Sequence, residues 1–577
     1  MKDIGIRKKK SPTKTEAHFI TFLLENPPQK RAVAVLCAIH LLLALMELLA
    51  FFFDGVFAVI VSRAWMCALL IFFVLSYKMI AQTIMKDVKE KNYFALAILA
   101  GVMALVFWGS GDQSVRSLNY ESTQQLAIGL RAFSKPDWDF TSLGFLGYPM
   151  RQYLMLALPS LLFGRSMFML HFSFDFIFAT GILLYYCGFR RVFQNERKSI
   201  LSKIAAVIPL LAILGSPYVS EYIKIREQSI LPPAFALMAC GLFMVLYLTF
   251  SVESLVTFSF CAAFLGSMYT PGLAVAALAI YAIVFWNYKK WRVLPKDHRV
   301  LLCFTAFYIG TLLMLTIFSL SRTGNQLSVE TASTEYILAT LKQIVTETPY
   351  GLFRLFTPIL LLFCVIAAGG FLKTYDGLIP LWALLTVLTA ISMRGYTANS
   401  SFAIQRTMVV APVIVAHFSI RVIGFKGPIQ IAGSYALLAL FSFAAIMNIV
   451  DPLPVLSTNI KFQAQSVNTY ISGEVQKITR MPSFRDSKPV LLYYTDDVWD
   501  SNIYDYTCYL APDVTAHSTY EGEIDRNYDP SGGLILYAKG SARIPESFIQ
   551  QYGEPETFEQ NIRGARVSFQ RIIVFPY

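Results

Sequence analysis

The stretch that decides the fold begins Trp108-Gly109-Ser110-Gly111-Asp112 and ends Leu162-Phe163-Gly164. An apolar run precedes it, a polar segment fills its middle, and a short apolar run follows Gly147-Tyr148-Pro149-Met150-Arg151-Gln152-Tyr153. Long apolar runs predict membrane spans, so the pattern places an acid, Asp112, where a span meets water. The glycines before this acid allow the chain to turn sharply there.

The composition of the whole chain restricts its class. Its 577 residues are 55% hydrophobic and only 15% charged, with a mean hydropathy of +0.53. Such a chain is too apolar for a soluble globular protein and too long for a single-span protein, which predicts a polytopic membrane protein. The net charge of +12 comes from lysines and arginines in short clusters between apolar runs. That distribution is typical of membrane topology signals, and nucleic-acid binding is not expected.

Basic clusters predict the orientation of the spans. About 13 apolar runs are long enough to cross a bilayer, and the basic clusters fall on one side when these spans alternate. That side is predicted to be the cytoplasm, so the segment after Asp112 and the C-terminal tail face the opposite compartment. The spans are predicted near 31–53, 56–78, 93–110, 166–189, 203–219, 231–250, 254–269, 271–288, 300–319, 351–372, 377–393, 404–421 and 429–450.

This topology requires that the run from Leu154 to Gly164 does not cross the membrane. The run is too short to span a bilayer and Pro159 interrupts it, so we expect an interfacial or re-entrant helix at the outer leaflet. The alternative is a true span joined tightly to the next helix. It would move Arg190 and Lys289 to the outside, against the positive-inside rule.

The tail after Asp451 is polar and rich in aromatic residues, unlike the rest of the chain. Its apolar runs predict strands at 490–494, 534–537 and 571–575 and helices at 502–510 and 545–552. The predicted fold is an all-α polytopic membrane domain of about 13 transmembrane helices with a small C-terminal extracytoplasmic α/β domain. The predicted divisions are a cytoplasmic N-terminus at 1–30, a transmembrane hairpin and cytoplasmic loop at 31–92, a membrane core at 93–450 with an outer loop at 111–165, a connector at 451–488 and the α/β domain at 489–577.

The segment described first resembles the first outer loop of the GT-C superfamily of glycosyltransferases, which take a sugar from a polyprenyl-phosphate carrier. In that superfamily the loop reads as an acid, a two-helix connection, then Pro, aromatics and Leu-Phe-Gly. The matching residues here are Asp112, Gly129-Leu130, Asp137-Trp138, Pro149, Tyr153 and Leu162-Phe163-Gly164. The resemblance covers about residues 93–421 and falls within the branch of protein O-mannosyltransferases and the lipid A aminoarabinose transferase.

The resemblance implies an inverting glycosyltransferase that moves a hexosyl or pentosyl group from an undecaprenyl- or dolichyl-phosphate donor to a lipid, glycan or protein acceptor. Asp112 would be the catalytic base and Glu121 its helper. The residues that would bind the donor phosphate are Lys224, Arg226, Arg394 and Arg406. The residues that would contact sugar or lipid are Tyr148, Arg151, Tyr153, His171, Asp175, Glu221 and Tyr222. No cofactor is certain, and a divalent metal at the acid stays open.

Each of these residues also has a structural interpretation. Asp112 could instead cap the helix that follows it, since Asp is favoured at that position. His171 and Asp175, spaced i, i+4 in an apolar span, could instead form a hydrogen-bonded packing pair. The mixed charges around Lys224 could be a surface cluster of little energetic weight, and the later arginines could be snorkelling residues at the interface. Many relatives carry an arginine after Leu-Phe-Gly, and His171 occupies about that place here, which weakens a transferred phosphate contact.

Two other classes of function stay open. A transporter or lipid flippase without glycosyl transfer would use ionisable residues inside the membrane, but its expected inverted repeats are not visible in the sequence. A non-catalytic scaffold would tolerate the loss of Asp112. No Walker A loop is present, so nucleotide-driven transport is not expected. We expect a multi-pass protein of the bacterial cytoplasmic membrane, with its N-terminus inside and its C-terminal domain outside, since no retrieval tetrapeptide closes the chain.

Overall fold

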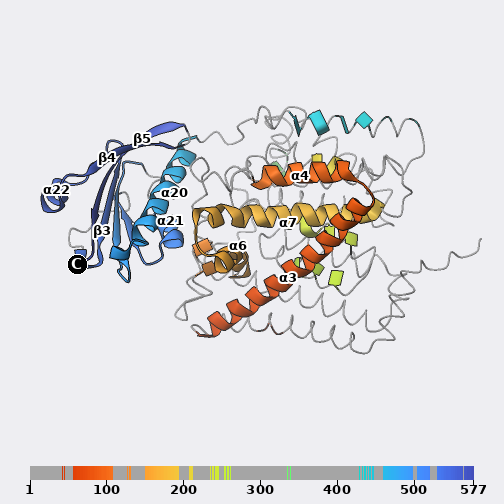
Figure 1. Ribbon diagram of the computed structural model, residues 1–577, viewed down its shortest axis with the longest axis horizontal. Coiled ribbons are helices and arrows are strands. Elements are labelled where there is room, and N and C mark those ends of the chain that lie inside the picture. The colour runs from red at the N-terminus through yellow and green to blue at the C-terminus, as the bar shows by residue number, and fades with distance from the viewer. Residues whose placement is uncertain are drawn as a thin grey trace, which may run out of the picture.

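A computed structural model describes a helical part and a C-terminal α/β part (Figure 1). The continuous segments that it describes are 56–107, 150–193, 459–497, 503–519, 529–562 and 564–577. Short runs and single positions are also described within 42–45, 126–130, 207–211, 234–261, 334–338 and 428–446. The predicted spans at 271–288, 300–319, 351–372, 377–393 and 404–421 lie outside the described residues.

The helical part is organised around one helix, α7. Its long helices are α3 (Val56–Lys89), α4 (Tyr93–Phe107), α6 (Met150–Phe163) and α7 (Met167–Phe193). Helix α7 packs against the other three, and α3 also packs against α4 and α6. In the described part of the chain, two helices are long and apolar enough to cross a membrane, over Val59–Lys89 and Phe168–Arg191. They fall where the sequence predicts spans at 56–78 and 166–189.

Helix α3 continues beyond its predicted end at residue 78, through the basic residues Lys86 and Lys89 of its last turn. Basic side chains interact favourably with the negative end of the helix dipole, so the polar turns remain helical. Lys91 then adopts a φ of 56° and the Asn92 N–H donates to the carbonyl of Asp87 at 2.9 Å. This tight turn reverses the chain into α4, which coincides with the predicted span at 93–110.

A tight corner joins α6 to α7. Gly164 has a φ of 85°, which glycine adopts without a Cβ penalty, and its N–H donates to the Ser160 carbonyl at 2.9 Å. Ser166 caps α7 because its Oγ accepts from the N–H of Met169 at 3.1 Å. Helix α6 is too short to cross a bilayer, as the sequence predicts. It continues through Pro159, which the sequence pattern treats as an interruption of the run. Its residues from 154 to 160 are buried.

The C-terminal part contains a five-stranded mixed sheet with the order β2-β1-β3-β5-β4. Strand β1 (Val490–Tyr494) is parallel to β2 (Thr515–Ser518) and β3 (Leu534–Lys539). Strand β5 (Ala565–Val574) is antiparallel to both β3 and β4 (Glu556–Ile562). Parallel neighbours need a crossover connection, and helix α21 (Ile503–Leu510) provides it between β1 and β2.

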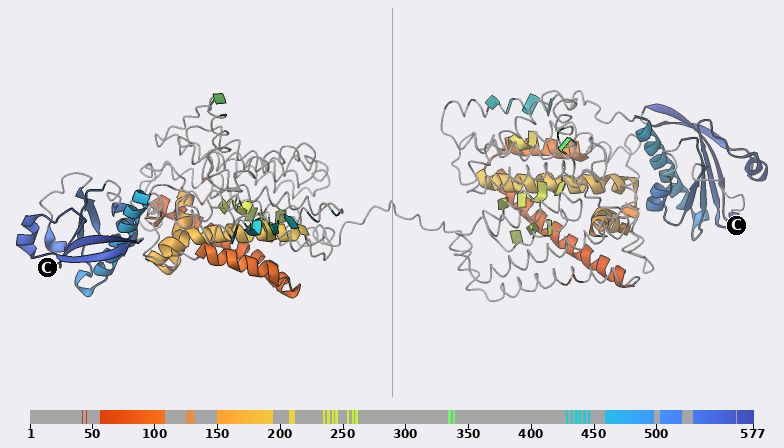
Figure 2. Two further views of the ribbon diagram at one scale, coloured as in Figure 1. Left: turned by 90° about the horizontal axis from the view of Figure 1, so that it is seen from above. Right: turned by 180° about the vertical axis from the view of Figure 1, so that it is seen from behind.

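Both faces of the sheet are covered. Successive residues of β1 point to opposite faces, so Leu491 and Tyr493 join one core while Leu492 and Tyr494 join the other. All four are buried, which explains the continuous apolar run in the sequence. Helix α21 packs in the first core, and helix α22 (Glu546–Tyr552) packs against the second. Figure 2 shows the α/β part from two further sides.

A long helix also lies within the segment 451–488, which the sequence predicts to be a connector. Helix α20 (Asn459–Thr479) places Val467, Ile471 and Val475 in the first core, together with residues of β1 and β3. These residues share one face of the helix because they are four positions apart. The remaining faces of α20 are largely polar in sequence, so its apolar stripe is less obvious than the strands beside it.

Candidate functional site

The N-terminal part of α7 holds two of the predicted site residues, His171 and Asp175. His171 and Asp175 are one turn apart on α7 and are 0% and 2% exposed. Phe107, the last residue of α4, stacks on Phe172 of α7 with ring centroids 5.6 Å apart. Helix α4 therefore ends beside the turn of α7 that carries His171 and Asp175.

A row of aromatic rings follows the same part of α7. Phe168, Phe172 and Phe176 are spaced i, i+4 and stack in sequence, with centroids 5.5 and 5.7 Å apart. Phe176 in turn stacks on Tyr77 of α3 at 5.8 Å. Phe168 is exposed, and the next two rings are half-buried. The row gives this side of α7 an apolar and partly open surface.

The C-terminal domain is attached at the same end of α7, through the corner between α6 and α7 (Figure 1). The hydroxyl groups of Ser160 and Tyr509 lie 2.6 Å apart and are buried. Arg165 donates from Nη1 to the Tyr509 carbonyl at 3.3 Å. Its own carbonyl accepts from Gln476 Nε2 at 3.2 Å and from Arg480 Nη2 at 3.0 Å. These hydrogen bonds fix the α/β domain to the corner at which α7 begins.

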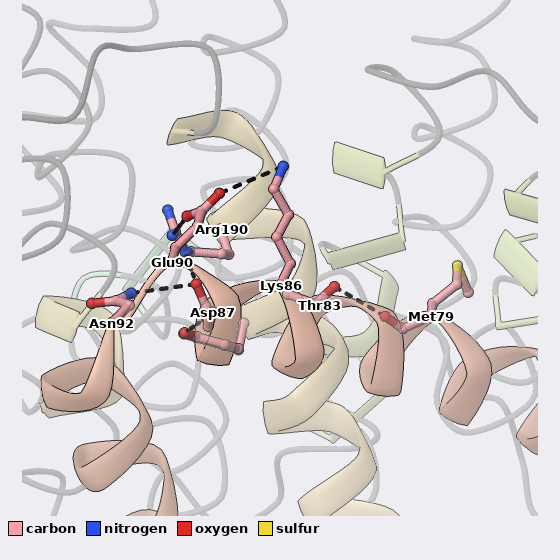
Figure 3. Close-up of polar contacts among 8 residues, drawn as sticks. Met79, Thr83, Lys86, Asp87, Glu90, Asn92 and Arg190 are labelled. Carbon is pink, nitrogen blue, oxygen red and sulfur yellow. Dashed lines mark hydrogen bonds and ion pairs between the residues drawn. The ribbon is translucent and has the colours of Figure 1, made fainter.

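A buried ion network joins α3 and α7 at their other ends (Figure 3). Arg190 Nε donates to Asp87 Oδ1 at 2.5 Å, and its Nη2 donates to Glu90 Oε2 at 2.5 Å. Tyr186 OH donates to Asp87 Oδ2 at 2.5 Å, and Asn92 Nδ2 donates to Oδ1 at 3.4 Å. The side chains of Asp87 and Arg190 are only 1% and 5% exposed. Protein donors thus occupy both oxygens of the Asp87 carboxylate.

This network has a structural role, because it holds the C-terminal ends of α3 and α7 together. The Arg190 fork engages two carboxylates, and the aspartate engages three donors, so little of either group is left for a ligand. Sequence reasoning counted Arg190 only within a basic cluster and did not single out Asp87. The sequence signal that could have identified Asp87 is its position, as an acid within the basic run that ends α3. A carboxylate that is buried there needs a cation nearby.

The structure describes part of the predicted site. It brings His171 and Asp175 together in the interior of the helical part, where their contact with sugar or lipid stays a prediction. Arg151 and Tyr153 belong to the first turn of α6. The predicted site residues outside the described residues are Asp112, Glu121, Tyr148, Glu221, Tyr222, Lys224, Arg226, Arg394 and Arg406. Within the described residues, no group of three or more His, Cys, Asp or Glu side chains is placed to hold a metal ion.

Sequence reasoning also missed the contacts of Arg165. This residue directly follows Leu162-Phe163-Gly164, at the place where the resemblance implies an arginine and where His171 was expected. In the structure Arg165 contacts the C-terminal domain through its side chain and its backbone. Its position beside a helix-ending glycine was the signal that could have identified it.

No protein-family model and no curated protein matches the chain. The chain is similar to ArnT from Cupriavidus metallidurans. In the structure bound to undecaprenyl phosphate, the match has a TM-score of 0.43 at 10% identity and covers 82% of this chain and 97% of that chain. The apo structure gives a TM-score of 0.45 at 11% identity over the same shares. An Archaeoglobus fulgidus oligosaccharyltransferase tethered to an acceptor peptide gives a TM-score of 0.38 at 12% identity, over 74% of this chain and 64% of that chain. At these values, functional assignment rests on the chain's own residues.

Proposed function

We propose that this chain is an inverting glycosyltransferase that moves a sugar from a polyprenyl-phosphate donor to a lipid, glycan or protein acceptor at the outer face of the cytoplasmic membrane. The contact between Phe107 and Phe172 carries the proposal. Phe107 is the last described residue before Asp112 in the chain, and it lies beside the buried pair His171 and Asp175, at the end of α7 opposite Arg190. Arginines mark the cytoplasmic end of a span, so the acid belongs to the outer end.

In the proposed reaction Asp112 acts as general base and takes the proton of the acceptor hydroxyl. The acceptor oxygen attacks the anomeric carbon while the bond from that carbon to the phosphate oxygen breaks, which inverts the configuration. The polyprenyl phosphate leaves with the electron pair and an added negative charge. Lys224, Arg226 or a later arginine would stabilise that charge by charge-assisted hydrogen bonds.

The described residues support a place for the carrier lipid. The aromatic row of α7 is apolar and partly open, and it begins at Phe168, next to the corner of α6 and α7. Leu162 and Phe163 at the end of α6 are 54% and 71% exposed. Apolar surface at the end of a membrane span favours contact with hydrocarbon chains, including an isoprenoid tail. Helical, buried Leu126 and Leu130 agree with the helical connection that the resemblance implies between the acid and α6.

The test uses the purified full chain with a panel of undecaprenyl- and dolichyl-phosphate-linked hexoses and pentoses, and with cell-envelope extracts that supply lipid, glycan and protein acceptors. We expect Asp112→Asn to lower the release of polyprenyl phosphate by about 10²- to 10⁴-fold, with insertion into the membrane unchanged. Asp139→Asn removes another acid of the same segment and is the matched control, with activity close to wild type.

Two results would contradict the proposal. Wild-type turnover by Asp112→Asn would remove the assigned role of the carboxylate. Failure of the wild-type chain to release polyprenyl phosphate from any donor of the panel would remove glycosyl transfer itself. The anomeric configuration of the product, measured by NMR, tests the inverting course separately, because retention would require a covalent or two-step route.

A further inference from the structure

The C-terminal domain contains a cavity of about 730 Å³ at the edge of the sheet where β1 and β2 begin. Three segments line it: the end of α20, residues 480–489 and the turn that follows α21. Its volume lies within the range of about 300–1,000 Å³ that is typical of small-molecule sites. Both apolar and charged side chains line it, which suits a ligand with mixed chemistry.

Hydrogen bonds place this cavity at the end of a membrane-spanning helix. Two of its lining residues, Gln476 and Arg480, donate to the carbonyl of Arg165 at 3.2 and 3.0 Å. The candidate span Phe168–Arg191 begins just after Arg165. A cavity anchored to this residue lies near the level at which lipid headgroups meet water.

Exposed apolar side chains lie beside the same anchor. Leu162 and Phe163, just before Arg165 in the chain, are 54% and 71% exposed. Met481, on the wall of the cavity, is 42% exposed. Large apolar side chains at a membrane surface favour burial among acyl chains. The cavity therefore has charged groups and lipid-compatible apolar groups within one local surface.

Four of the five charged side chains that line the cavity are available to a ligand, and only Arg480 is bonded within the described part of the protein. Arg485 and Lys488 are exposed, and within the part of the chain that the structure describes their side chains make no hydrogen bond or ion pair. The same is true, within that part of the chain, of the carboxylates of Asp486 and Asp513. Together with Arg480 the lining carries three cations and two carboxylates, which favours a ligand that bears an anion and also hydrogen-bond donors.

The ends of α20 and α21 also lie here, and helix C-termini attract cations rather than anions. Two of the carbonyl groups at these helix ends, however, are bonded within the protein. The Ile478 carbonyl accepts from the Met481 N–H at 3.0 Å, and the Leu510 carbonyl accepts from Gln476 Nε2 at 2.8 Å. The cationic side chains of the cavity are therefore not needed to satisfy these carbonyls.

We infer that the cavity binds the phosphate-bearing headgroup of an outer-leaflet lipid, with Arg485 and Lys488 on the phosphate. Asp486 and Asp513 accept hydrogen bonds from hydroxyl or ammonium groups of the same headgroup. The acyl chains extend along Leu162 and Phe163 into the bilayer. This site holds the C-terminal domain to the membrane surface, and it does not depend on the proposed glycosyl transfer.

The experiment is native mass spectrometry of the full chain in detergent micelles, titrated with phosphatidylglycerol, phosphatidylethanolamine, phosphatidylcholine or soluble glycerol phosphate. We expect the double variant Arg485→Gln/Lys488→Gln to bind phosphatidylglycerol and phosphatidylethanolamine at least about tenfold more weakly than wild type. The matched control is Arg543→Gln/Arg566→Gln, which removes the same charge from exposed positions of the same domain outside the cavity. Its affinities should equal those of wild type.

A second measurement locates the bound lipid. A photoreactive phosphatidylglycerol should cross-link to peptides within 480–489, and the double variant should lose this product. Equal binding by the double variant and the control, or cross-links only elsewhere, would overturn the site. Phosphatidylcholine bound as tightly as phosphatidylethanolamine would overturn the role of the carboxylates, because its headgroup donates no hydrogen bond. Competition by glycerol phosphate at the lipid's own affinity would identify a soluble phosphate ligand instead and overturn the lipid assignment.

Discussion

The two ends of α7 are held in different ways. At Arg190 the helix is fixed to α3 by the buried ion pair of Arg190 with Asp87 and by a second ion pair with the more exposed Glu90. At Arg165 it is fixed to the C-terminal domain by hydrogen bonds that hydroxyl and carbonyl oxygens accept, with no carboxylate among these described partners, beside stacked rings and exposed apolar side chains. Removing one partner of a buried ion pair costs far more than losing a neutral hydrogen bond. Helix α7 thus has an ion-paired end, at Arg190, and an open end, at Arg165, where the surface is available to lipid and ligand.

The strongest test of this contrast removes Arg190, the cation of the ion-paired end. Arg190→Ala leaves Asp87 buried without its cation, so we expect a loss of about 3–5 kcal/mol in the free energy of unfolding. Thermal unfolding of the full chain in micelles measures it. Arg191→Ala, at the next position, lies outside the hydrogen-bonded network and should cost much less. Equal losses in the two variants would show that the ion network does not fix the helix.

A second test changes the packing of α7 between its two ends. A Cβ atom at Gly241 would lie 2.1 Å from the carbonyl oxygen of Leu184 on α7. Gly241→Ala should therefore force the two backbones apart and cost about 1–3 kcal/mol. Gly101→Ala is the control, because no atom lies within 4 Å of the added carbon on α4. The control should be stabilised by about 0.5–1 kcal/mol, and destabilisation of both variants would contradict the packing.

A third test concerns Tyr509, whose side chain contacts the corner of α6 and α7 at the Arg165 end of α7. Tyr509→Phe removes the hydrogen bond with Ser160 and should cost about 0.5–1.5 kcal/mol at neutral pH. Burial raises the pKa of Tyr509 from 10.0 to about 12, against smaller lowering effects of the Ser160 hydrogen bond and of Arg165. Above pH 10 the unfolded chain therefore binds fewer protons than the folded one, and the stability contributed by this group falls as pH approaches 12.

Denaturant unfolding of wild type and Tyr509→Phe at several pH values measures this effect. The stability difference between the two chains should shrink from pH 10 to pH 12, because only the wild type carries the titrating phenol. Tyr504→Phe, at an exposed position of the same helix, is the control and should follow wild type. A difference that stays constant across this range would contradict burial of the Tyr509 hydroxyl in the interface.

The smallest effect is expected at an ion pair on the surface. Lys78 and Glu253 lie 2.6 Å apart, but each side chain is 49% exposed. Water and salt screen such pairs, so Lys78→Ala should cost only about 0.2–1 kcal/mol, and less at high salt. A loss as large as that of Arg190→Ala would show that burial does not separate these two pairs, and it would remove the basis of the comparison.

Helices and strands with long, continuous apolar runs could be predicted from the sequence. The apolar runs located α3, α4 and α7, and the short run from Leu154 to Gly164 indicated the limited length of α6. Continuous apolar runs likewise located β1 and β3. Strands β2 and β4 were missed because they are edge strands, where short or largely polar sequences are favoured and the apolar pattern is weak.

Contacts between distant segments could not be predicted in this way. The sequence shows an acid at Asp87 and an arginine at Arg190, but not that two helices bring them to 2.5 Å. The contact of Ser160 with Tyr509 joins residues 349 positions apart, and no periodicity connects them. For the candidate site, the sequence predicts the residue types, while the structure adds the stack of Phe107 on Phe172 that relates α4 to α7.

The most direct test of the central claim is a cryo-EM map of the full chain with undecaprenyl phosphate bound. The account predicts phosphate density at the end of α7 beside the stack of Phe107 and Phe172, close to Asp112, with the tail along the row from Phe168 to Phe176. Phosphate density at the Arg190 end, or an Asp112 carboxylate with no cleft beside it, would contradict the claim.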